Sequence, residues 1–368
     1  MQVPFFRPSI EALDEQRMLD CVRSGWLTTG EISRAFEEAV AEKTGARHVV
    51  AFSSCTAALH SALAWHALRP GDEVIVPTYT FVATAAAVHH AGGVPVPCDV
   101  RDDDLLVDVE MIERAVTPRT RGVVVVDLAG KVCDLFAIEA FCRKQGLFLI
   151  EDAAHSFGAR HAGVPVGGHG VTACFSFYAT KNVTTGEGGA LVTDHAAVAA
   201  YARRFRLHGM DADAWKRYGG RWQPYDVADF GWKYNLPDVL AALGIGQIQR
   251  LEEMTARRRA IAARFSAALV DLPVRLPAID DGHCWHLYML RTDRRDALME
   301  YLAEHEVATA VHYPPLHRLA VMRRSDKDFP VATRAYAEEL SLPLYPNLRP
   351  DEEDYVIAQI RRFFEECP

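Results

Sequence analysis

With 368 residues, 49% of them hydrophobic and 24% charged, the chain has the composition of a globular protein rather than a disordered one. Its 40 basic and 49 acidic residues give a formal net charge of −9, which argues against a nucleic-acid partner or an anionic membrane surface. No apolar run reaches the length of a membrane span, and the opening stretch MQVPFFRPSIEALDEQ lacks the pattern of a signal peptide, so we expect a cytoplasmic protein.

Apolar runs alternate with helical patterns through the first two thirds of the chain. Strands are predicted at 48–54, 72–77, 94–100, 122–129 and 146–154, and helices at 55–68 and 80–92. The runs GVVVVDLA and GLFLIEDAA are almost wholly apolar, as expected of strands covered on both faces, which predicts a mostly parallel sheet. Strands around Cys174 and Leu191 follow each other so closely that an antiparallel pair or a short insertion is expected there.

From Leu236 an apolar stripe at helical spacing runs through a long segment, in which Gly244 and Gly246 predict a kink. The remainder has an α+β pattern, with a strand at 286–292, a helix at 294–307 and a terminal helix that opens on Pro350. We therefore expect a large α/β domain over residues 1–245, joined by a long helix to a smaller α+β domain over residues 246–368.

The eight cysteines are scattered and form no C-x-x-C pair, so neither a zinc ribbon nor a thioredoxin-like site is expected, and reduced thiols fit best. Cys284 and His286, in HCWH, stand two residues apart, but no second pair follows them. The preferred interpretation of this segment is a strand with alternating faces, and no metal is expected.

Lys181 ends the apolar run FSFYATK and is followed by the small, flexible stretch TTGEGG. A lysine that has lost its hydration can keep its amine neutral and form a Schiff base with an aldehyde. The alternative is a surface lysine after a strand, which is the commoner situation.

Asp152 ends GLFLIEDAA, at the C-terminal edge of a predicted parallel strand, where α/β proteins bind ligands. A carboxylate there can keep a ring nitrogen protonated, so that the ring withdraws electrons. The alternative is a cap for the next helix, and the neighbouring Glu151 is the better candidate for a purely structural role.

Ser54 and Thr56 stand where a predicted strand ends and a helix begins, a place where free N–H groups and hydroxyls bind phosphate well. The alternative is an ordinary N-cap. Each of these features is weak alone. Their order, a phosphate site followed by an acidic strand end and then a lysine with a glycine-rich segment, points to pyridoxal 5′-phosphate (PLP).

Several motifs strengthen this interpretation: EDAAHSFGA, CFSFYATKNVTTGEGGALVTD, GWKYNLPDVLAALGIGQ, GWLTTG, SCTAALHSAL, PTYTFVAT and VHYPPLH. With them the chain resembles, over almost its whole length, the nucleotide-sugar aminotransferases of the DegT/StrS type. These are fold-type I PLP enzymes related to aspartate aminotransferase. The lysine segment with GEGG is the most specific of the motifs, whereas the phosphate site alone would not be.

The resemblance implies roles for individual residues around the cofactor ring. Lys181 would hold PLP as a Schiff base and move the proton between the sugar carbon and the cofactor. Asp152 would pair with the pyridinium nitrogen, and Phe81 would stack on the ring. His155 falls where the family places a polar contact beside the ring or its phenolic oxygen.

The resemblance also implies contacts to the cofactor phosphate and to the substrate. Thr56, Ala57 and Ser176 would bind the phosphate, and Asn235 would reach the phosphate of the neighbouring subunit, which makes the active site depend on a homodimer. The positions that resemble the substrate pocket are Thr28, Thr29, Glu187, His312 and Tyr313. Of these, His312 could equally be a packed loop histidine.

One position departs from the family pattern. Relatives usually carry a histidine within VHLAG-x-x-x-D, whereas this chain reads VDLAGKVCD, with Asp127 at that place and Lys131 shortly after it. Because the segment leads from a central strand towards the cofactor, we expect the changed charge to alter the polarity of the pocket.

The implied reaction is a two-step transamination, in which L-glutamate gives its amino group to the cofactor and a nucleotide-diphosphate keto-sugar then receives it. LHGMDADAW and KYNLPD resemble the enzymes that act at C4 of 4-keto-6-deoxy sugars, whereas C3 enzymes tend to carry an arginine-leucine-aspartate run after the asparagine. The alternatives are a C3 aminotransferase, a PLP-dependent sugar dehydratase, in which the lysine is usually a histidine, and a non-enzymatic regulatory binding protein, which would be expected to lose Lys181 or Asp152.

Overall fold

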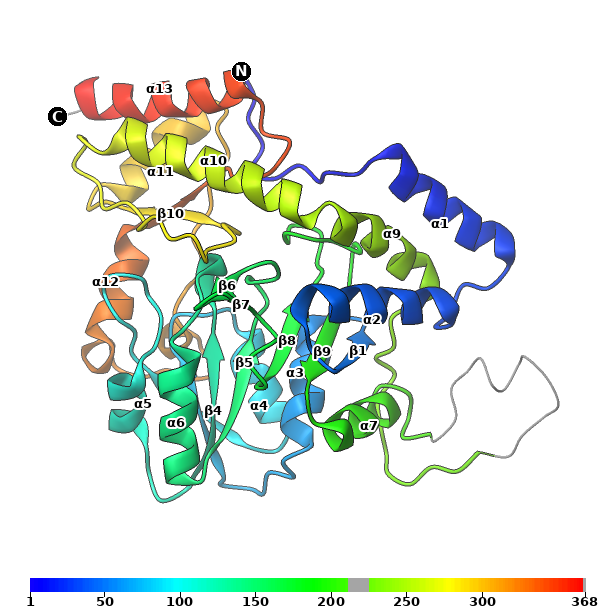
Figure 1. The fold of residues 1–368 in the computed structure, drawn as a ribbon. Coiled ribbons are helices and arrows are strands. Elements are labelled where there is room, and N and C mark those ends of the chain that lie inside the picture. Colours follow the sequence, from blue (N-terminus) through cyan, green and yellow to red (C-terminus); the bar gives the residue numbers. More distant parts are fainter. Residues whose placement is uncertain (211–224, 367–368) are drawn as a thin grey trace.

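The computed structural model describes residues 1–210 and 225–366 of the chain (Figure 1). Its helices are, in chain order, α1 (Ala12–Ser24), α2 (Glu31–Thr44), α3 (Cys55–Ala64), α4 (Ala83–His90), α5 (Val109–Ala115), α6 (Leu135–Gln145), α7 (Ala196–Phe205), α9 (Asp238–Gln249), α10 (Leu251–Leu269), α11 (Arg295–Glu304), α12 (Pro330–Glu338) and α13 (Pro350–Glu366). Its strands are β1 (His48–Phe52), β2 (Glu73–Pro77), β3 (Val94–Cys98), β4 (Thr120–Val126), β5 (Phe148–Asp152), β6 (Arg160–His161), β7 (Val164–Pro165), β8 (Thr172–Ser176), β9 (Gly189–Thr193), β10 (Tyr288–Arg291) and β11 (Glu339–Leu342). Short 3₁₀ turns are η1 (Leu128–Gly130), η2 (Leu316–Arg318) and η3 (Asp326–Asp328). The motif LHGMDADAW lies, from Asp211 on, outside the described residues.

Seven of these strands form one sheet in the order β1-β9-β8-β5-β4-β2-β3. Strand β9 runs antiparallel to both of its neighbours, whereas β8, β5, β4, β2 and β3 pair in parallel. The α/β class and the mostly parallel sheet are therefore confirmed. The antiparallel pair expected around Cys174 and Leu191 is β8 with β9.

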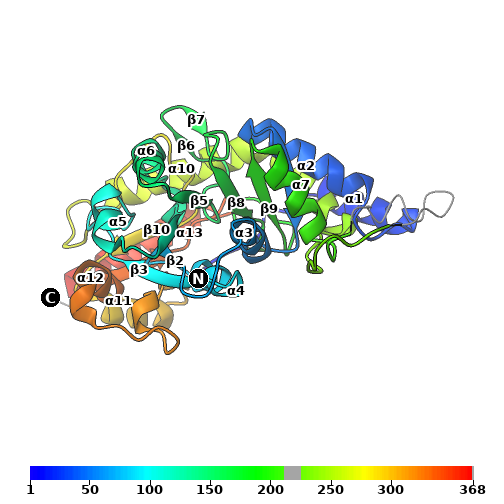
Figure 2. The same ribbon diagram turned by 90° about the horizontal axis from the view of Figure 1, so that it is seen from below.

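Helices cover both faces of this sheet (Figure 2). Val50 and Ile150 pack on the face covered by α3, α4 and α7, whereas Val49 packs on the opposite face, against α2 and α9. Because side chains alternate along a strand, Asp152 points to the same face as Ile150, and Glu151 points to the other. This alternation delivers the carboxylate of Asp152 to the starts of α3 and α4.

A second core lies where α10, α11 and α13 pack around the small antiparallel sheet of β10 and β11, as the α+β pattern predicts. The first residues of the chain also join it, beside α13 (Figure 1). Val3 is fully buried there and forms a bridge with Val307, and Arg7 lies 2.9 Å from Glu352 of α13. The division into domains at residues 245 and 246 stays a prediction.

The predicted kink at Gly244 and Gly246 is wrong, because α9 runs through both glycines and the helical segment breaks at Arg250. The two glycines instead allow close packing. A Cβ atom at Gly244 would lie 2.4 Å from the ring of Phe36, and one at Gly246 would lie 1.8 Å from Asp14. Their small size therefore serves the contacts of α9 with α1 and α2.

The expectation that HCWH forms a strand is also wrong. Residues 283–287 are irregular, Trp285 has a left-handed backbone with φ 54°, and β10 begins only at Tyr288. The backbone of this segment pairs with η1 rather than with a strand, since the N–H of His286 donates to the carbonyl of Ala129 at 2.9 Å.

None of the described helices is long and apolar enough to cross a membrane.

A single carboxylate joins α9 to the start of α2. Helix α2 begins after Gly30, which has no side chain to cap it, and Asp238 supplies the missing acceptor. Its oxygens accept from the N–H groups of Gly30 (2.7 Å), Ile32 (3.2 Å) and Ser33 (2.9 Å), and from the Ser33 hydroxyl (2.5 Å). The motifs GWLTTG and KYNLPD are therefore two halves of one buried contact.

Replacing Asp238 by alanine should lower the free energy of unfolding by about 2–4 kcal/mol, because several buried donors lose their acceptor together. Urea unfolding followed by circular dichroism measures the change. The control is Asp20→Ala on the exposed face of α1, which should cost less than about 0.5 kcal/mol. Equal effects of the two variants would contradict the capping role.

Candidate active site

The carboxyl ends of the parallel strands surround a cavity of about 580 Å³. Residues after β1, β2, β5 and β8 form its wall, together with Phe5 and residues between 310 and 313. The predicted site residues that line it are Thr56, Phe81, Asp152, His155, Ser176, Lys181, Glu187, His312 and Tyr313. Parallel strands bring their carboxyl ends to one edge, which is why positions so far apart in sequence meet here.

Lys181 reaches this cavity from the turn that follows β8. The turn is closed by the N–H of Lys181, which donates to the carbonyl of Tyr178 at 2.9 Å. Burial lowers the pKa of the amine to about 8, although Cys55 and Asp152 raise it. A substantial fraction of the amine is therefore neutral near physiological pH, which a nucleophilic or proton-transferring lysine requires.

Asp152 is buried at the floor of the cavity, with 4% of its surface exposed. Its carboxylate accepts from the Thr84 hydroxyl at 2.7 Å and from the N–H of Ala154 at 3.3 Å, and the thiol of Cys55 lies 3.9 Å away. Burial raises the pKa of Asp152, while these donors and Lys181 lower it. The hydrogen bonds thus favour the ionised form that a protonated ring nitrogen needs.

His155 lines the cavity next to Asp152 as a neutral imidazole. The N–H of Ala129 donates to Nδ1 at 3.2 Å, so the ring proton resides on Nε2, which faces the Tyr313 hydroxyl at 3.1 Å. Burial and the charge of Lys181 hold the pKa of His155 well below its ordinary value. His155 can therefore donate a hydrogen bond into the cavity without carrying a charge.

The start of α3 has two functions that the sequence left as alternatives. Ser54 is the N-cap, since its hydroxyl accepts from the N–H of Ala57 at 3.1 Å. The N–H groups of Cys55 and Thr56 belong to the first turn, which has no intrahelical acceptors, and both residues line the cavity. A phosphate could therefore bind at these groups, whereas the side chain of Ala57 is not part of the cavity wall.

The glycine-rich segment brings β9 against this helix start. A Cβ atom at Gly189 would lie 2.4 Å from the backbone of Ser54 and Cys55, so only glycine fits there. Gly186 has φ 80°, a conformation that glycine adopts without strain. The GEGG motif therefore shapes the chain so that the lysine turn and the helix start share one cavity.

Thr29 and Asn235 lie together, but away from the cavity wall. The Asn235 amide donates to the Thr29 hydroxyl at 2.7 Å, which in turn donates to the carbonyl of Leu236 at 2.6 Å. Thr28 and Thr29, with Asn235, are half-buried and absent from the cavity lining. The predicted contacts of these residues with ligand therefore stay predictions.

His312 contributes to the cavity wall and is also firmly held. Its N–H donates to Glu339 at 2.8 Å, and Nδ1 lies 2.9 Å from the Ser341 hydroxyl. Its ring stacks on Phe5, with centroids 5.5 Å apart, so a residue near the start of the chain forms part of the wall. Burial lowers the pKa of His312 to about 4, which keeps the imidazole neutral.

Asp127 does not line the cavity, so the expected change in pocket polarity does not arise at the cavity wall. Its side chain is fully buried and accepts from the Ser156 hydroxyl (2.7 Å) and from the N–H of Cys133 (3.1 Å). Burial raises the pKa of Asp127 to about 6 and that of the adjacent Glu151 well above its ordinary value. The aspartate in place of the family's usual histidine therefore changes the buried hydrogen bonds just after β4 and β5, and not the cavity wall.

Reasoning from the sequence missed four residues: Phe5, Cys55, Thr84 and His286. Thr84 and Cys55 lie within quoted motifs, but nothing in the sequence shows that they contact Asp152. His286 was noticed only as a possible metal ligand, yet its Nε2 lies 3.4 Å from Nζ of Lys181. Its position follows from the irregular path of residues 283–287, which the strand interpretation excluded.

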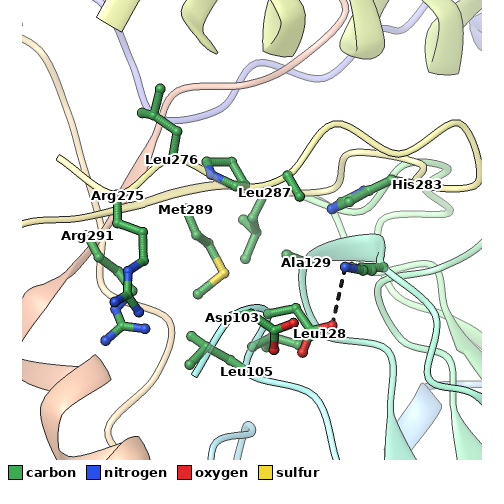
Figure 3. Close-up of a pocket in the computed structure, with 14 residues that line it drawn as sticks. Asp103, Leu105, Leu128, Ala129, Arg275, Leu276, His283, Leu287, Met289 and Arg291 are labelled. Carbon is green, nitrogen blue, oxygen red and sulfur yellow. Dashed lines mark ion pairs between the residues drawn. The ribbon is translucent and has the colours of Figure 1, made fainter. Parts of the chain in front are cut away.

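A second, much smaller cavity of about 60 Å³ lies between η1 and the segment that leads into β10 (Figure 3). Leu128 and Ala129 face His283 and Leu287 across it. It contains none of the predicted site residues, and its volume is too small for a cofactor.

The larger cavity fits PLP in the chemistry of its donors. It presents an amine that is partly neutral, a buried carboxylate, a neutral imidazole N–H and a helix start with free N–H groups. These match, in turn, an aldehyde, a ring nitrogen, a phenolic oxygen and a phosphate.

Thr84→Val should weaken the binding of PLP to the apoprotein about tenfold, because Asp152 loses a hydrogen bond to its charged form and its pKa rises. Fluorescence titration with PLP measures the affinity. The control is Thr172→Val in β8, whose hydroxyl contacts Thr193 rather than Asp152. Unchanged affinity in Thr84→Val would contradict the support of Asp152 by this hydroxyl.

Comparison with known proteins places the chain in a family. The DegT/DnrJ/EryC1/StrS aminotransferase family matches residues 8–361. The spore coat polysaccharide biosynthesis protein SpsC of Bacillus subtilis is 40% identical, with 98% of this chain and 96% of SpsC covered.

Solved structures agree with this relationship. The putative sugar aminotransferase Spr1654 from Streptococcus pneumoniae, in its PMP form, superposes with a TM-score of 0.93 at 30% identity, with 99% of this chain and 100% of that chain covered. The same protein is also known in a PLP form. Helicobacter pylori PseC, an aminotransferase involved in the biosynthesis of pseudoaminic acid, gives a TM-score of 0.91 at 26% identity, with both chains fully covered (100% each). The chain thus belongs to the DegT/DnrJ/EryC1/StrS family and is a PLP-dependent aminotransferase that acts on sugars.

Proposed function

We propose that the enzyme transfers the amino group of L-glutamate to C4 of a nucleotide-diphosphate 4-keto-6-deoxyhexose, in the cytoplasm and as a homodimer. The observation that carries the proposal is the placement of Lys181 and Asp152 in one cavity that has a phosphate-binding helix start at its edge. The choice of C4 is supported by Asn235-Leu236-Pro237-Asp238, which lacks the arginine-leucine-aspartate run of the C3 enzymes.

The relatives support a sugar as substrate, and the nucleotide is part of what the sequence motifs imply. SpsC is a spore coat polysaccharide biosynthesis protein, and PseC is an aminotransferase involved in the biosynthesis of pseudoaminic acid.

Lys181 and Asp152 would carry out the central chemistry. PLP, when bound, supplies an aldehyde that takes up the amino group and a ring that withdraws electrons from the substrate carbon. Lys181 holds the aldehyde and, once released, moves the proton at the substrate carbon. Asp152 keeps the ring nitrogen protonated, and Phe81 covers one face of the ring.

The other residues would bind and orient. His155 donates from Nε2 to the phenolic oxygen, which its neutral state allows. The phosphate is bound by Thr56, Ala57 and Ser176, the last at the end of β8, and by Asn235 of the neighbouring subunit. The sugar and the donor are contacted by Thr28, Thr29, Glu187, His312 and Tyr313. Of these, Glu187, His312 and Tyr313 line the cavity in one protomer.

A dimer would explain why the remaining residues lie outside the cavity of a single chain. Thr29 and Asn235 form their own hydrogen-bonded cluster near the exposed apolar residues Leu27 (49% exposed) and Trp232 (49%). Large apolar side chains left exposed in this way are typical of an interface. In the dimer, this cluster would complete the neighbour's site.

The absorption spectrum of the protein loaded with PLP tests the function. We expect a yellow band that disappears when L-glutamate is added and returns with an NDP-4-keto-6-deoxyhexose. A panel that includes 3-keto sugars and several nucleotides identifies the substrate, and recovery of the colour by a 3-keto sugar alone would reassign the position.

Lys181→Ala should bind PLP only non-covalently, so borohydride should fix no cofactor to it. Fixation of PLP to another lysine in the wild type would overturn the role of Lys181.

Hybrid dimers test the shared site. Lys181→Ala and Asn235→Ala protomers, co-expressed with different affinity tags, should form hybrids with one intact site, because each protomer supplies what its partner lacks. The purified hybrid should be more active than either parent dimer, which assay of the three species establishes. An active monomer in sedimentation, or a hybrid no better than its parents, would refute the sharing.

A further inference from the structure

His286 contacts Lys181 on the side away from the large cavity, and it has no role in the mechanism proposed above. Nε2 of His286 lies 3.4 Å from Nζ of Lys181, the one polar partner of this amine that the described residues provide within hydrogen-bond distance. His286 is 5% exposed and comes from the irregular segment before β10, 105 residues after Lys181. The lysine and its histidine partner therefore belong to different parts of the chain.

The position of His286 is fixed on two sides. Toward η1, its N–H donates to the carbonyl of Ala129 at 2.9 Å, and the N–H of Cys284 donates to Gly130 at 3.1 Å. Figure 3 shows Ala129 beside His283 and Leu287, the residues that flank this stretch. Toward the lysine turn, the Asn182 amide donates to the carbonyl of Cys284 at 3.1 Å. These backbone hydrogen bonds hold the segment in the position that brings the ring of His286 next to Lys181.

The cavities show on which side of the lysine this histidine lies. Lys181 lines the large cavity and also a small one of about 40 Å³, whereas His286 lines only the small one. A ligand in the large cavity therefore contacts Lys181 but not His286. Any effect of His286 on the reaction must pass through the lysine amine.

A protonated Lys181 can only donate, so a neutral His286 can bind it only as an acceptor. Asp152 and Cys55 face the amine from β5 and α3, and three histidines, His155, His286 and His312, face it from the other segments. Burial and the charge of Lys181 hold the pKa of His286 well below its ordinary value, so the ring is neutral. A neutral ring with its proton on Nδ1 offers the lone pair of Nε2 to an ammonium group.

We propose that His286 is a positioning residue for Lys181: its Nε2 accepts a hydrogen bond from Nζ whenever the amine is not bound to the cofactor, and so holds the amine ready for proton transfer. The inference rests on the role proposed for Lys181. It adds a resting place for the lysine during each catalytic cycle, outside the space that the ligand occupies. It also links the lysine turn to the segment 283–287, which leads into β10.

The first test uses the apoprotein, so that it does not depend on the substrate or on turnover. The pH dependence of acetylation of Lys181, read by peptide mass spectrometry, gives the midpoint at which the amine loses its proton. In His286→Asn the side chain is too short to reach Nζ, so the ammonium form loses a partner and the midpoint should fall by about one pH unit. In His286→Gln the amide oxygen takes the place of Nε2, and the midpoint should stay close to the wild-type value.

His283→Gln is the matched control. His283 lies in the same segment and is equally buried, but its Nδ1 accepts from the N–H of Trp285 and does not face Lys181. It should leave the midpoint unchanged. An unchanged midpoint in His286→Asn, or an equal fall in His283→Gln, would overturn the proposal.

A measurement without variants is ¹⁵N NMR of the wild-type apoprotein, in which the His286 Nε2 resonance should shift as the pH passes through about 8. A resonance that does not respond overturns it too.

In the loaded enzyme, His286→Asn should lower kcat about 10- to 100-fold with little change in KM, and His286→Gln should recover most of the loss. A rise in KM alone would show a binding role and overturn the proposal. Failure of the proposed function would appear differently. The wild type would not respond to glutamate or keto-sugars, while the acetylation midpoints would still report whether His286 holds the lysine.

Discussion

A buried amine and a buried carboxylate share the same cavity, and the rest of the structure depends on keeping both usable. Burial alone would make each of them neutral, because it lowers the pKa of Lys181 and raises that of Asp152. Their opposite charges and the hydrogen bond from Thr84 counteract this for Asp152. For Lys181 the effect of burial prevails, and its pKa of about 8 allows the amine to lose a proton near neutral pH. The fold must therefore hold the two groups close together and away from bulk water.

The sheet does this through strand ends. Asp152 ends β5, and Lys181 lies in the short turn that follows β8, the parallel neighbour of β5, so the pairing of the two strands sets where that turn begins. Gly189 then allows β9 to return against the start of α3, which brings the helix N–H groups to the same edge. The ends of β5 and β8 and the start of α3 thus bring the carboxylate, the lysine turn and the helix N–H groups to one edge of the sheet.

Much of this arrangement can be predicted from the sequence because it follows from local pattern. Near-continuous apolar runs mark the parallel strands, and the residue at the end of each run is at the ligand-binding edge, which identifies Asp152 and Lys181. Ser54 could be assigned either as a cap or as a phosphate ligand, and the structure shows the cap while leaving its neighbours for a ligand.

What could not be predicted depends on contacts between distant segments. Glycines in a helix normally indicate a weak point, yet Gly244 is there because Phe36 packs on it. HCWH alternates like a strand, but its backbone hydrogen bonds go to η1, and that partner is more than 150 residues earlier in the chain, at Ala129. His286 could be recognised as a neighbour of Lys181 only once this pairing was known.

The packing of the first residues has a consequence for how the enzyme comes into being. Phe5 forms part of the cavity wall, and it is held in place because Val3 pairs with Val307 and Arg7 with Glu352. A ribosome synthesises Arg7 345 residues before Glu352, so this segment leaves the ribosome long before its partner in α13 exists. Contacts of such long sequence separation form late and slowly. The strands of the large sheet, which end at Thr193, can pair while the chain is growing, but the cavity can close on its Phe5 side only after α13 has been synthesised.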